Sequence, residues 1–360
     1  MSEEVVVPLG GRSYPVVVET GAYAGLGPRL VERVGRRRAI LVTEERVEPL
    51  WGPAVRAALA GHLEVETVVL PAGEAHKTVE TWSGCVDARL ERGVDRKTPI
   101  LALGGGVLGD VAGFAAAATL RGLPFVQLPT TLLAMVDSSV GGKTGVNHRW
   151  GKNLIGAFHQ PRLVYAALAT LDTLPPEERI AGLGEVVKMA LLGDAALLTR
   201  LEAEAERLRA GDPEVLAPVI ARCVTLKAEV VGRDEREAGW RAVLNAGHTV
   251  GHAYEAACGF GVLRHGEAVA LGLLAETRWA VAAGHCVDVD LPERLARLLT
   301  RLGLPTRPPR ASRERLLAAI RMDKKAHGDM LALPIPVRAG HIALLDVPVA
   351  EVGELFPEGP

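Results

Sequence analysis

Histidine and glutamate side chains in the second half of the sequence have a spacing that could bind a metal ion. His248 and His252 are four residues apart, so they would lie on one face of a helix. His265 begins a further predicted helix, and Glu185 lies upstream on an otherwise apolar helical segment. One carboxylate and two imidazoles suit a catalytic Zn²⁺ ion with an open fourth position. Three histidines compete for two places, and spacing alone favours His248 with His252. The alternative is that they are capping or core histidines.

A glycine-rich turn in the first half is typical of a dinucleotide-binding loop. The apolar run Ile100–Leu103 predicts a strand, and Gly104, Gly106 and Gly109 follow it as G-x-G-x-x-G before a predicted helix. Such glycines permit close backbone approach, and the helix N-terminus offers N–H groups to a pyrophosphate. The turn follows a late strand, and no acidic residue about 20 positions on is placed to hold a ribose. The ribose partner is then expected among Glu44, Glu45 and Glu74. The alternative is tight packing of small residues.

A second glycine-rich segment carries rare ammonium and amide groups. Gly141-Gly142-Lys143-Thr144 looks like the end of a nucleoside-triphosphate loop but lacks its earlier glycine, which argues against that function. Lys143, Lys152 and Asn153 instead predict a loop that binds an anionic, polyhydroxylated ligand. The alternative is a solvated surface loop.

Cations are numerous around these segments. Only eight of the 41 Lys and Arg residues are lysines, so a lysine is expected where a compact ammonium group is needed. A set of cations close to a partly buried cleft is costly to leave unpaired. This set predicts an anionic substrate that carries a phosphate and a carboxylate; its members are Arg121, Lys143, Lys152, Lys188, Lys227, Arg241 and one of Lys324 and Lys325.

Composition excludes several classes of protein. The formal net charge of −2 gives no electrostatic case for nucleic-acid binding, and no apolar stretch is long enough to span a membrane. The N-terminus is acidic and has no signal-peptide core, so we expect a cytoplasmic protein. Four widely spaced cysteines predict reduced thiols in place of a disulfide framework or a cysteine metal site.

The elements that must position these residues fall into two patterns. Short β-branched runs alternate with helical segments as far as Ala166, which predicts a mostly parallel sheet covered by helices. Periodic stretches rich in Ala, Leu, Glu and Arg follow from Pro176 and predict helices. The fold class is therefore an α/β N-terminal dinucleotide-binding domain, residues 1–175, and an all-α C-terminal metal- and substrate-binding domain, residues 176–360. A ligand cleft is expected between them.

Five motifs together resemble one family over nearly the whole chain and in the same order. They are GGGVLGDVAGF (104–114), LPTTLLAMVDSSVGGKTGVN (128–147), GKNLIGAFHQP (151–161), GEVVK (184–188), and LNAGHTVGHAYE (244–255) with RHGEAVALG (264–272). The family is 3-dehydroquinate synthase, the second enzyme of the shikimate pathway. The resemblance implies a homodimer that uses catalytic NAD⁺ and one divalent metal, Zn²⁺ or Co²⁺. It implies conversion of 3-deoxy-D-arabino-heptulosonate 7-phosphate (DAHP) into 3-dehydroquinate and phosphate.

The resemblance also implies roles for individual residues. The metal ligands become Glu185, His248 and His265, and His252 then faces the substrate phosphate. Catalytic positions are Asp137, Lys143, Lys188, Asn245 and His252; substrate-binding positions are Arg121, Lys152, Asn153, Lys227, Arg241, Lys324 and Lys325, with Arg121 reaching the phosphate from the neighbouring subunit. Cofactor-binding positions are Glu44, Gly73, Glu74, Lys77, Gly105, Gly106, Val107, Leu108, Gly109, Asp110, Thr130, Thr131, Lys143, Lys152, Thr170, Leu171, Asp172 and Thr173.

Three other functions compete with this interpretation. A valiolone- or inosose-forming sugar-phosphate cyclase would share the fold and cofactors but would act on a substrate without a carboxylate. The Gly141–Gly145 loop with Lys227 and Arg241 favours the acid. A glycerol-type metal-dependent dehydrogenase would show net reduction of its cofactor. A non-catalytic binding module would have no use for Glu185 beside two histidines.

Overall fold

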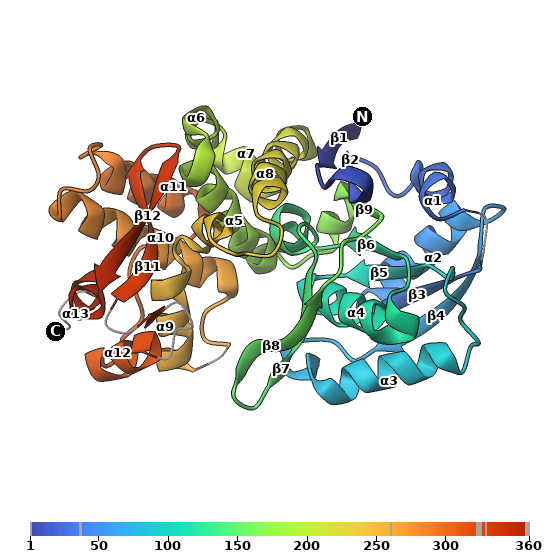
Figure 1. Ribbon diagram of the computed structural model, residues 1–360. Coiled ribbons are helices and arrows are strands. Elements are labelled where there is room, and N and C mark those ends of the chain that lie inside the picture. The colour runs from blue at the N-terminus through green and yellow to red at the C-terminus, as the bar shows by residue number, and fades with distance from the viewer. Residues whose placement is uncertain (1, 36–37, 260, 322–325, 328–329, 357–360) are drawn as a thin grey trace. The chain divides into compact units, whose positions relative to one another are not determined.

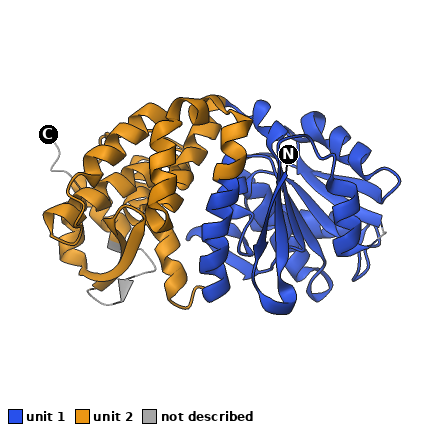
Figure 2. Ribbon diagram, turned by 90° about the horizontal axis from the view of Figure 1, so that it is seen from above, with its two compact units in different colours: residues 1–175, 220–236 blue, residues 176–219, 237–360 orange. Residues whose placement is uncertain are grey.

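The computed structural model describes residues 2–35, 38–259, 261–321, 326–327 and 330–356. The chain forms two compact units (Figures 1 and 2). Unit 1 comprises residues 1–175 and 220–236, and unit 2 comprises residues 176–219 and 237–360. The division runs through one long helix, α8 (Pro213–Arg233), which a single boundary at residue 175 does not anticipate.

Unit 1 is built on a seven-stranded sheet in the order β1-β2-β9-β6-β5-β3-β4. Only the β1–β2 pair is antiparallel, so the predicted mostly parallel sheet is confirmed. The strands are β1 (Ser2–Val7), β2 (Tyr14–Glu19), β3 (Arg38–Glu44), β4 (Glu64–Leu70), β5 (Ile100–Gly104), β6 (Phe125–Pro129) and β9 (Leu163–Ala167). The helices beside them are α1 (Leu26–Val34), α2 (Glu48–Leu59), α3 (Val79–Leu90) and α4 (Gly106–Ala118).

Both faces of this sheet are buried, which explains its continuous apolar strands. In β3, Ala39 and Leu41 point into one core with α1 and α2, whereas Ile40 and Val42 point into a second core with α3 and α4. Side chains alternate between the two faces because successive Cβ atoms of a strand point in opposite directions. The sheet therefore fixes the ends of its strands rigidly, and the candidate ligand-binding residues stand at those ends.

The segment predicted as a glycine-rich loop is more ordered than expected. It contains a π-helical turn (Ala134–Ser138) and a two-stranded antiparallel hairpin, β7 (Lys143–His148) and β8 (Gly151–Phe158). Glycines allow the two strands to lie close together, since a Cβ on Gly156 would lie 2.1 Å from the carbonyl oxygen of Thr144. The rare lysines and asparagines of this segment are therefore held on a defined scaffold.

Unit 2 is mostly helical, as predicted. Its helices are α5 (Pro176–Gly193), α6 (Ala195–Ala203), α7 (Ala205–Ala210), the first part of α8, α9 (His248–Cys258), α10 (His265–Ala282), α11 (Leu291–Leu302), α12 (Arg313–Arg321) and α13 (Val349–Val352). It also contains a small antiparallel sheet of β10 (Ala326–His327), β11 (Met330–Arg338) and β12 (His341–Pro348), so the expectation of an all-α domain was incomplete.

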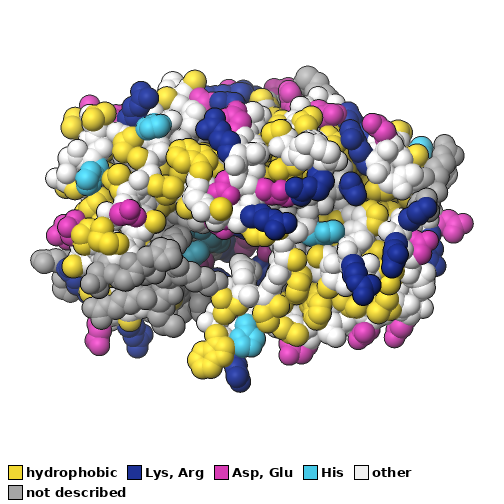
Figure 3. Space-filling view, viewed as in Figure 1, with side chains coloured by type: hydrophobic (Ala, Val, Ile, Leu, Met, Phe, Trp, Pro, Cys, Tyr) yellow, Lys and Arg dark blue, Asp and Glu magenta, His cyan; other side chains and the backbone are white. Residues whose placement is uncertain are grey.

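Within the described residues, no helix is both long and apolar enough to cross a membrane. On the face shown in Figure 3, acidic and basic side chains are interspersed over both units.

Candidate metal centre and dinucleotide site

The structure brings Glu185, His248 and His265 together in unit 2. Glu185 lies in the middle of α5, and the two histidines are the first residues of α9 and α10. The Oε1 atom of Glu185 is 3.6 Å from Nε2 of His248 and 3.3 Å from Nε2 of His265. Donor atoms around a tetrahedral metal with bonds of about 2.0–2.2 Å lie about 3.3–3.6 Å apart. The measured separations therefore fit a shared ion.

Glycine contacts between helices make this convergence possible. A Cβ on Gly266, next to His265, would lie 1.7 Å from the carbonyl oxygen of Ala181 in α5. A Cβ on Gly272 of α10 would lie 1.9 Å from the carbonyl oxygen of Gly247. Gly247 itself adopts φ +76° immediately before α9, a conformation that favours glycine. Helices α5 and α9 therefore approach α10 more closely than larger side chains would allow.

Charge at the site favours a cation. Glu185 is fully buried and forms an ion pair with Lys188 one turn along α5. Burial alone would lower the pKa of His265, but hydrogen bonds to Glu185 and Glu255 outweigh it and raise that pKa to about 9. An imidazole that holds a proton between two carboxylates marks a position where positive charge is stabilised. The ring of His248 is oriented by a 3.1 Å contact between Nδ1 and the carbonyl oxygen of Ala246, as is usual for metal-binding histidines.

His252 lies beside this cluster. It is exposed, and its ring centroid is 5.3 Å from that of His248 and 5.9 Å from that of His265. A second group with metal-binding spacing contains His252, Glu255 and His265. Among the described residues, neither group contains both His248 and His252, the pair that spacing alone favoured.

The glycine-rich turn lies at the carboxyl end of β5 in unit 1. Helix α4 begins at Gly106, and a Cβ on Gly106 would lie 2.8 Å from Oγ of Ser138. In open α/β sheets, ligands bind outside the carboxyl ends of the strands. The turn therefore has the position and the backbone approach that a dinucleotide requires.

A small cavity opens at the same edge of the sheet. Of the three expected ribose partners, only Glu44 lines it, and burial raises the pKa of this carboxyl group. Glu74 instead accepts a 2.7 Å hydrogen bond from Asn147, and Glu45 is exposed. Four lining residues of this cavity were expected from the sequence: Glu44, Val107, Leu108, and His76, which lies within the predicted segment 73–77. The other lining residues, Leu70, Pro71, Thr81 and Val111, were not expected.

A buried ammonium group connects the turn to the hairpin. Lys77 Nζ donates to Oδ2 of Asp110 and to Oδ1 of Asn153, each at 2.6 Å. Burial raises the pKa of Asp110, and the charge of Lys77 opposes that shift. Asn153 adopts φ +54° and its N–H donates to the side chain of Asn147 at 2.9 Å. Three predicted ligand-binding residues thus form one network.

A second buried lysine contacts the π-helical turn. Lys227 Nζ lies 2.7 Å from Oδ1 of Asp137 and 2.6 Å from the carbonyl oxygen of the same residue. The side chains of Lys227 and Asp137 are 6% and 24% exposed, so the ion pair is largely shielded from water on the lysine side. π-Helical turns occur frequently at functional sites.

The other predicted site residues are more scattered. In unit 2, Lys188 and Arg241 are buried, and Asn245 donates to Glu237 at 3.1 Å. Lys324 and Lys325 lie outside the described residues. In unit 1, the structure places the remaining predicted residues as follows: Thr130, Thr170, Leu171 and Gly109 are buried; Gly73, Gly105 and Thr131 are half-buried; Arg121, Lys143, Lys152, Asp172 and Thr173 are exposed.

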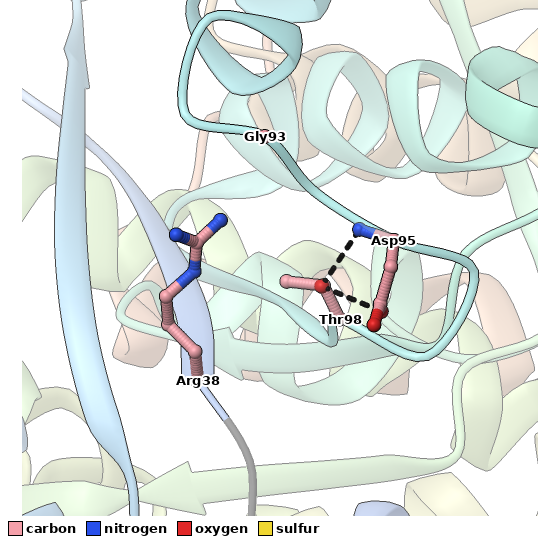
Figure 4. Close-up of a pocket in the computed structure, with 4 residues that line it drawn as sticks. All are labelled: Arg38, Gly93, Asp95 and Thr98. Atoms are coloured by element: carbon pink, nitrogen blue, oxygen red, sulfur yellow. Dashed lines mark hydrogen bonds between the residues drawn. The ribbon is translucent and has the colours of Figure 1, made fainter.

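A larger cavity of about 260 Å³ lies elsewhere in unit 1 (Figure 4). Its lining includes Arg38, the first residue of β3, and Thr98, which lies two residues before β5. The cavity therefore lies at the amino ends of these strands. Thr98 is engaged by Asp95, whose N–H donates to the Thr98 hydroxyl and whose Oδ1 accepts from it. Its position opposite the glycine-rich turn separates this cavity from the candidate site.

Comparisons with known proteins agree over most of the chain. A family model described as 3-dehydroquinate synthase N-terminal matches residues 67–181, and one described as 3-dehydroquinate synthase C-terminal matches residues 182–326. A 3-dehydroquinate synthase of Pelobacter propionicus is 46% identical over 329 residues, which cover 91% of each chain.

Two solved structures of other cyclases share the fold. A 2-deoxy-scyllo-inosose synthase complexed with carbaglucose-6-phosphate, NAD⁺ and Co²⁺ has a TM-score of 0.89 at 25% identity, over 98% of this chain and 99% of that one. A 2-epi-5-epi-valiolone synthase from Streptomyces hygroscopicus subsp. jinggangensis 5008 with NAD⁺ and Zn²⁺ bound has a TM-score of 0.86 at 32% identity, over 95% of each chain.

Proposed function

The chain belongs to the 3-dehydroquinate synthase family, and we infer that it converts DAHP into 3-dehydroquinate and inorganic phosphate. The structural observation that carries this function is the convergence of a buried carboxylate and two imidazoles from three helices of unit 2. Identity to the synthase is 46%, against 25% and 32% to the two other cyclases, which favours the acid substrate.

Glu185, His248 and His265 are the residues proposed to hold a divalent metal, Zn²⁺ or Co²⁺. Their donor set of one oxygen and two nitrogens, its spacing, and the cation-attracting charge of the site support this assignment. When bound, such a metal polarises a substrate hydroxyl and lowers its pKa. Lys188 places an ammonium group beside Glu185, and this ion pair orients the carboxylate.

NAD⁺ is the proposed second cofactor, and it supplies a reversible acceptor for hydride. The chain would bind it with the glycine-rich turn, residues 105–110, with Glu44 at the adjoining cavity, and with the predicted residues 73–77, 130–131, 143, 152 and 170–173. Lys77 neutralises Asp110 next to this turn, so the local negative charge does not repel a pyrophosphate.

The remaining residues are proposed to orient the anionic substrate. Lys227 fixes the carboxylate and backbone of Asp137 through two hydrogen bonds, which holds Oδ1 in one position. Arg121, Lys152, Asn153, Arg241, Asn245, His252 and the Lys324–Lys325 pair complete the proposed set of substrate contacts. Oxidation and reduction cancel over a turnover, so these groups act by orientation and charge stabilisation.

Metal-dependent release of phosphate tests this function. Purified protein with DAHP and catalytic NAD⁺ is expected to release phosphate, to stop on chelation, and to recover on addition of Zn²⁺, without accumulation of NADH. Steady formation of NADH from a simple polyol would instead indicate a glycerol-type dehydrogenase. Release only from a sugar phosphate that lacks the carboxylate would indicate a different cyclase.

We also propose that the protein is a homodimer, that it is cytoplasmic, and that its two domains divide between residues 175 and 176. Strand β8 supports a dimer, because Leu154 and Phe158 lie on the same face of the strand and are 40% and 42% exposed. The four free cysteines, of which Cys85, Cys223 and Cys286 are buried, suit a reducing compartment.

Disruption of this face is expected to separate the subunits. Leu154→Glu places a charge on the proposed interface and should convert a dimer into a monomer in light scattering. Leu50→Glu is the matched control, since Leu50 is also exposed, at 52%, but lies on α2. A Leu154→Glu variant that remains dimeric, or a monomeric parent protein, would exclude this surface as the interface.

A further inference from the structure

Arg89 is a fully buried arginine on α3. Its Nε donates to the carbonyl oxygen of Cys85 at 2.9 Å, and its Nη2 donates to Oγ1 of Thr119 at 3.3 Å. Its Nη1 has no hydrogen-bond partner among the described residues, and no carboxylate there pairs with it. Burial of a guanidinium group without a carboxylate is costly, so a structural reason for it is expected.

The electrostatic compensation comes from helix ends. Arg89 lies in the last turn of α3, which ends at Leu90, and it contacts Thr119, which caps the end of α4. Both helices present their partially negative C-termini to this region. The guanidinium group is therefore stabilised at the position where it donates to Thr119 at the end of α4.

The segment that follows this cap is strained. Leu120 and Arg121 have φ of +50° and +67°, and Gly122 has φ of +118°. Consecutive residues with side chains in the left-handed region are unfavourable and persist only where the surroundings fix them. Arg121, at the centre of the turn, is exposed, and within the described residues it makes no ion pair. The strained backbone thus presents an unpaired guanidinium group to solvent.

Thr119 is the point at which this turn is attached. Its hydroxyl donates to the carbonyl oxygen of Ala115 at 2.7 Å and accepts from Arg89, and its carbonyl oxygen accepts from the N–H of Gly122 at 3.0 Å. A side chain that fixes Thr119 therefore fixes both ends of the turn. Arg89 approaches it from a different helix, so the attachment does not depend on α4 alone.

We propose that Arg89 is a positioning residue that holds the strained turn 119–122 through Thr119 and thereby aims Arg121 at the phosphate of the substrate. This inference rests on the proposed function, in which Arg121 reaches the phosphate in the site of the neighbouring subunit. Arg89 touches neither substrate nor cofactor. Its effect is on the orientation of Arg121 and so on substrate binding.

A double-mutant cycle tests the coupling between these arginines. Arg89→Met replaces the guanidinium group with a shorter, unbranched apolar side chain and is expected to raise the KM for DAHP about tenfold, with kcat within about twofold of the parent. The inhibition constant of inorganic phosphate should rise in parallel, whereas the KM for NAD⁺ and the zinc content stay unchanged. The double variant Arg89→Met/Arg121→Ala should be no worse than Arg121→Ala alone. Arg92→Met, three residues further along the chain, is the control for loss of an arginine here.

A purely structural role would give a different pattern. Additive effects in the cycle, or a rise in the KM for NAD⁺ equal to that for DAHP, would overturn the inference. If Arg89→Met does not fold, Thr119→Val, which removes the hydroxyl that Arg89 contacts, takes its place in the cycle. Thr119→Ser keeps this hydroxyl and should have the KM of the parent. An unchanged KM in Arg121→Ala would refute the positioning role while the synthase function stands. Absence of phosphate release by the parent protein would refute the function itself.

Discussion

His265→Ala is expected to abolish tight metal binding, whereas His252→Ala is expected to retain it. His265 contributes one of two imidazoles that lie within 3.6 Å of Glu185, and its loss leaves this carboxylate with a single imidazole beside it. We expect metal affinity to fall by more than about 100-fold and kcat/KM by on the order of 1,000-fold. Metal content after dialysis, measured by atomic emission, checks the first effect.

His252→Ala is the matched control because it removes an imidazole from the same cluster. It should keep about one metal ion per chain and raise the KM for DAHP about tenfold, since His252 is proposed to face the phosphate. Loss of metal from His252→Ala together with its retention in His248→Ala would instead favour the second group of His252, Glu255 and His265, since His265 belongs to both groups.

Lys227→Met is expected to lower kcat/KM by on the order of 100- to 1,000-fold, because it leaves the Asp137 carboxylate without its shielded partner. The free energy of unfolding should fall by about 3 kcal/mol, a typical cost of breaking a buried ion pair from one side. Steady-state kinetics and urea unfolding measure the two effects. Lys97→Met, which removes an exposed lysine of the same unit, should change neither. Equal activity of the Lys227 and Lys97 variants would remove Lys227 from the proposed site.

The parallel sheet could be predicted because its strands are buried on both faces. Each reads as a continuous apolar run, such as Ile40–Val42 and Ile100–Leu103, with little dependence on distant parts of the chain. The hairpin β7–β8 could not be predicted in this way, because most of β8 is exposed and lacks an alternating pattern. Strand β11 was missed because Pro334 and Pro336 interrupt it, although Leu331, Leu333 and Ile335 are fully buried.

The sequence predicted which residues belong to the candidate site better than it predicted which of them lie together. The sequence identified Glu185, His248 and His265 as metal-binding candidates, but helical spacing favoured His252 over His265. The helices α5 and α10 meet through Gly266 and Ala181, a long-range contact that no local spacing encodes. The cavity residue Thr81 was missed for the same reason, since strand order alone brings it to Glu44.

X-ray absorption at the zinc edge tests the central claim, that Glu185, His248 and His265 share one ion. The zinc-loaded protein should contain about one zinc per chain, bound by two imidazoles and by oxygen, with no sulfur. The imidazole signal should fall by half in His248→Ala and stay intact in His252→Ala. A sulfur ligand in the parent protein, or a spectrum altered by His252→Ala but not by His248→Ala, would contradict the account.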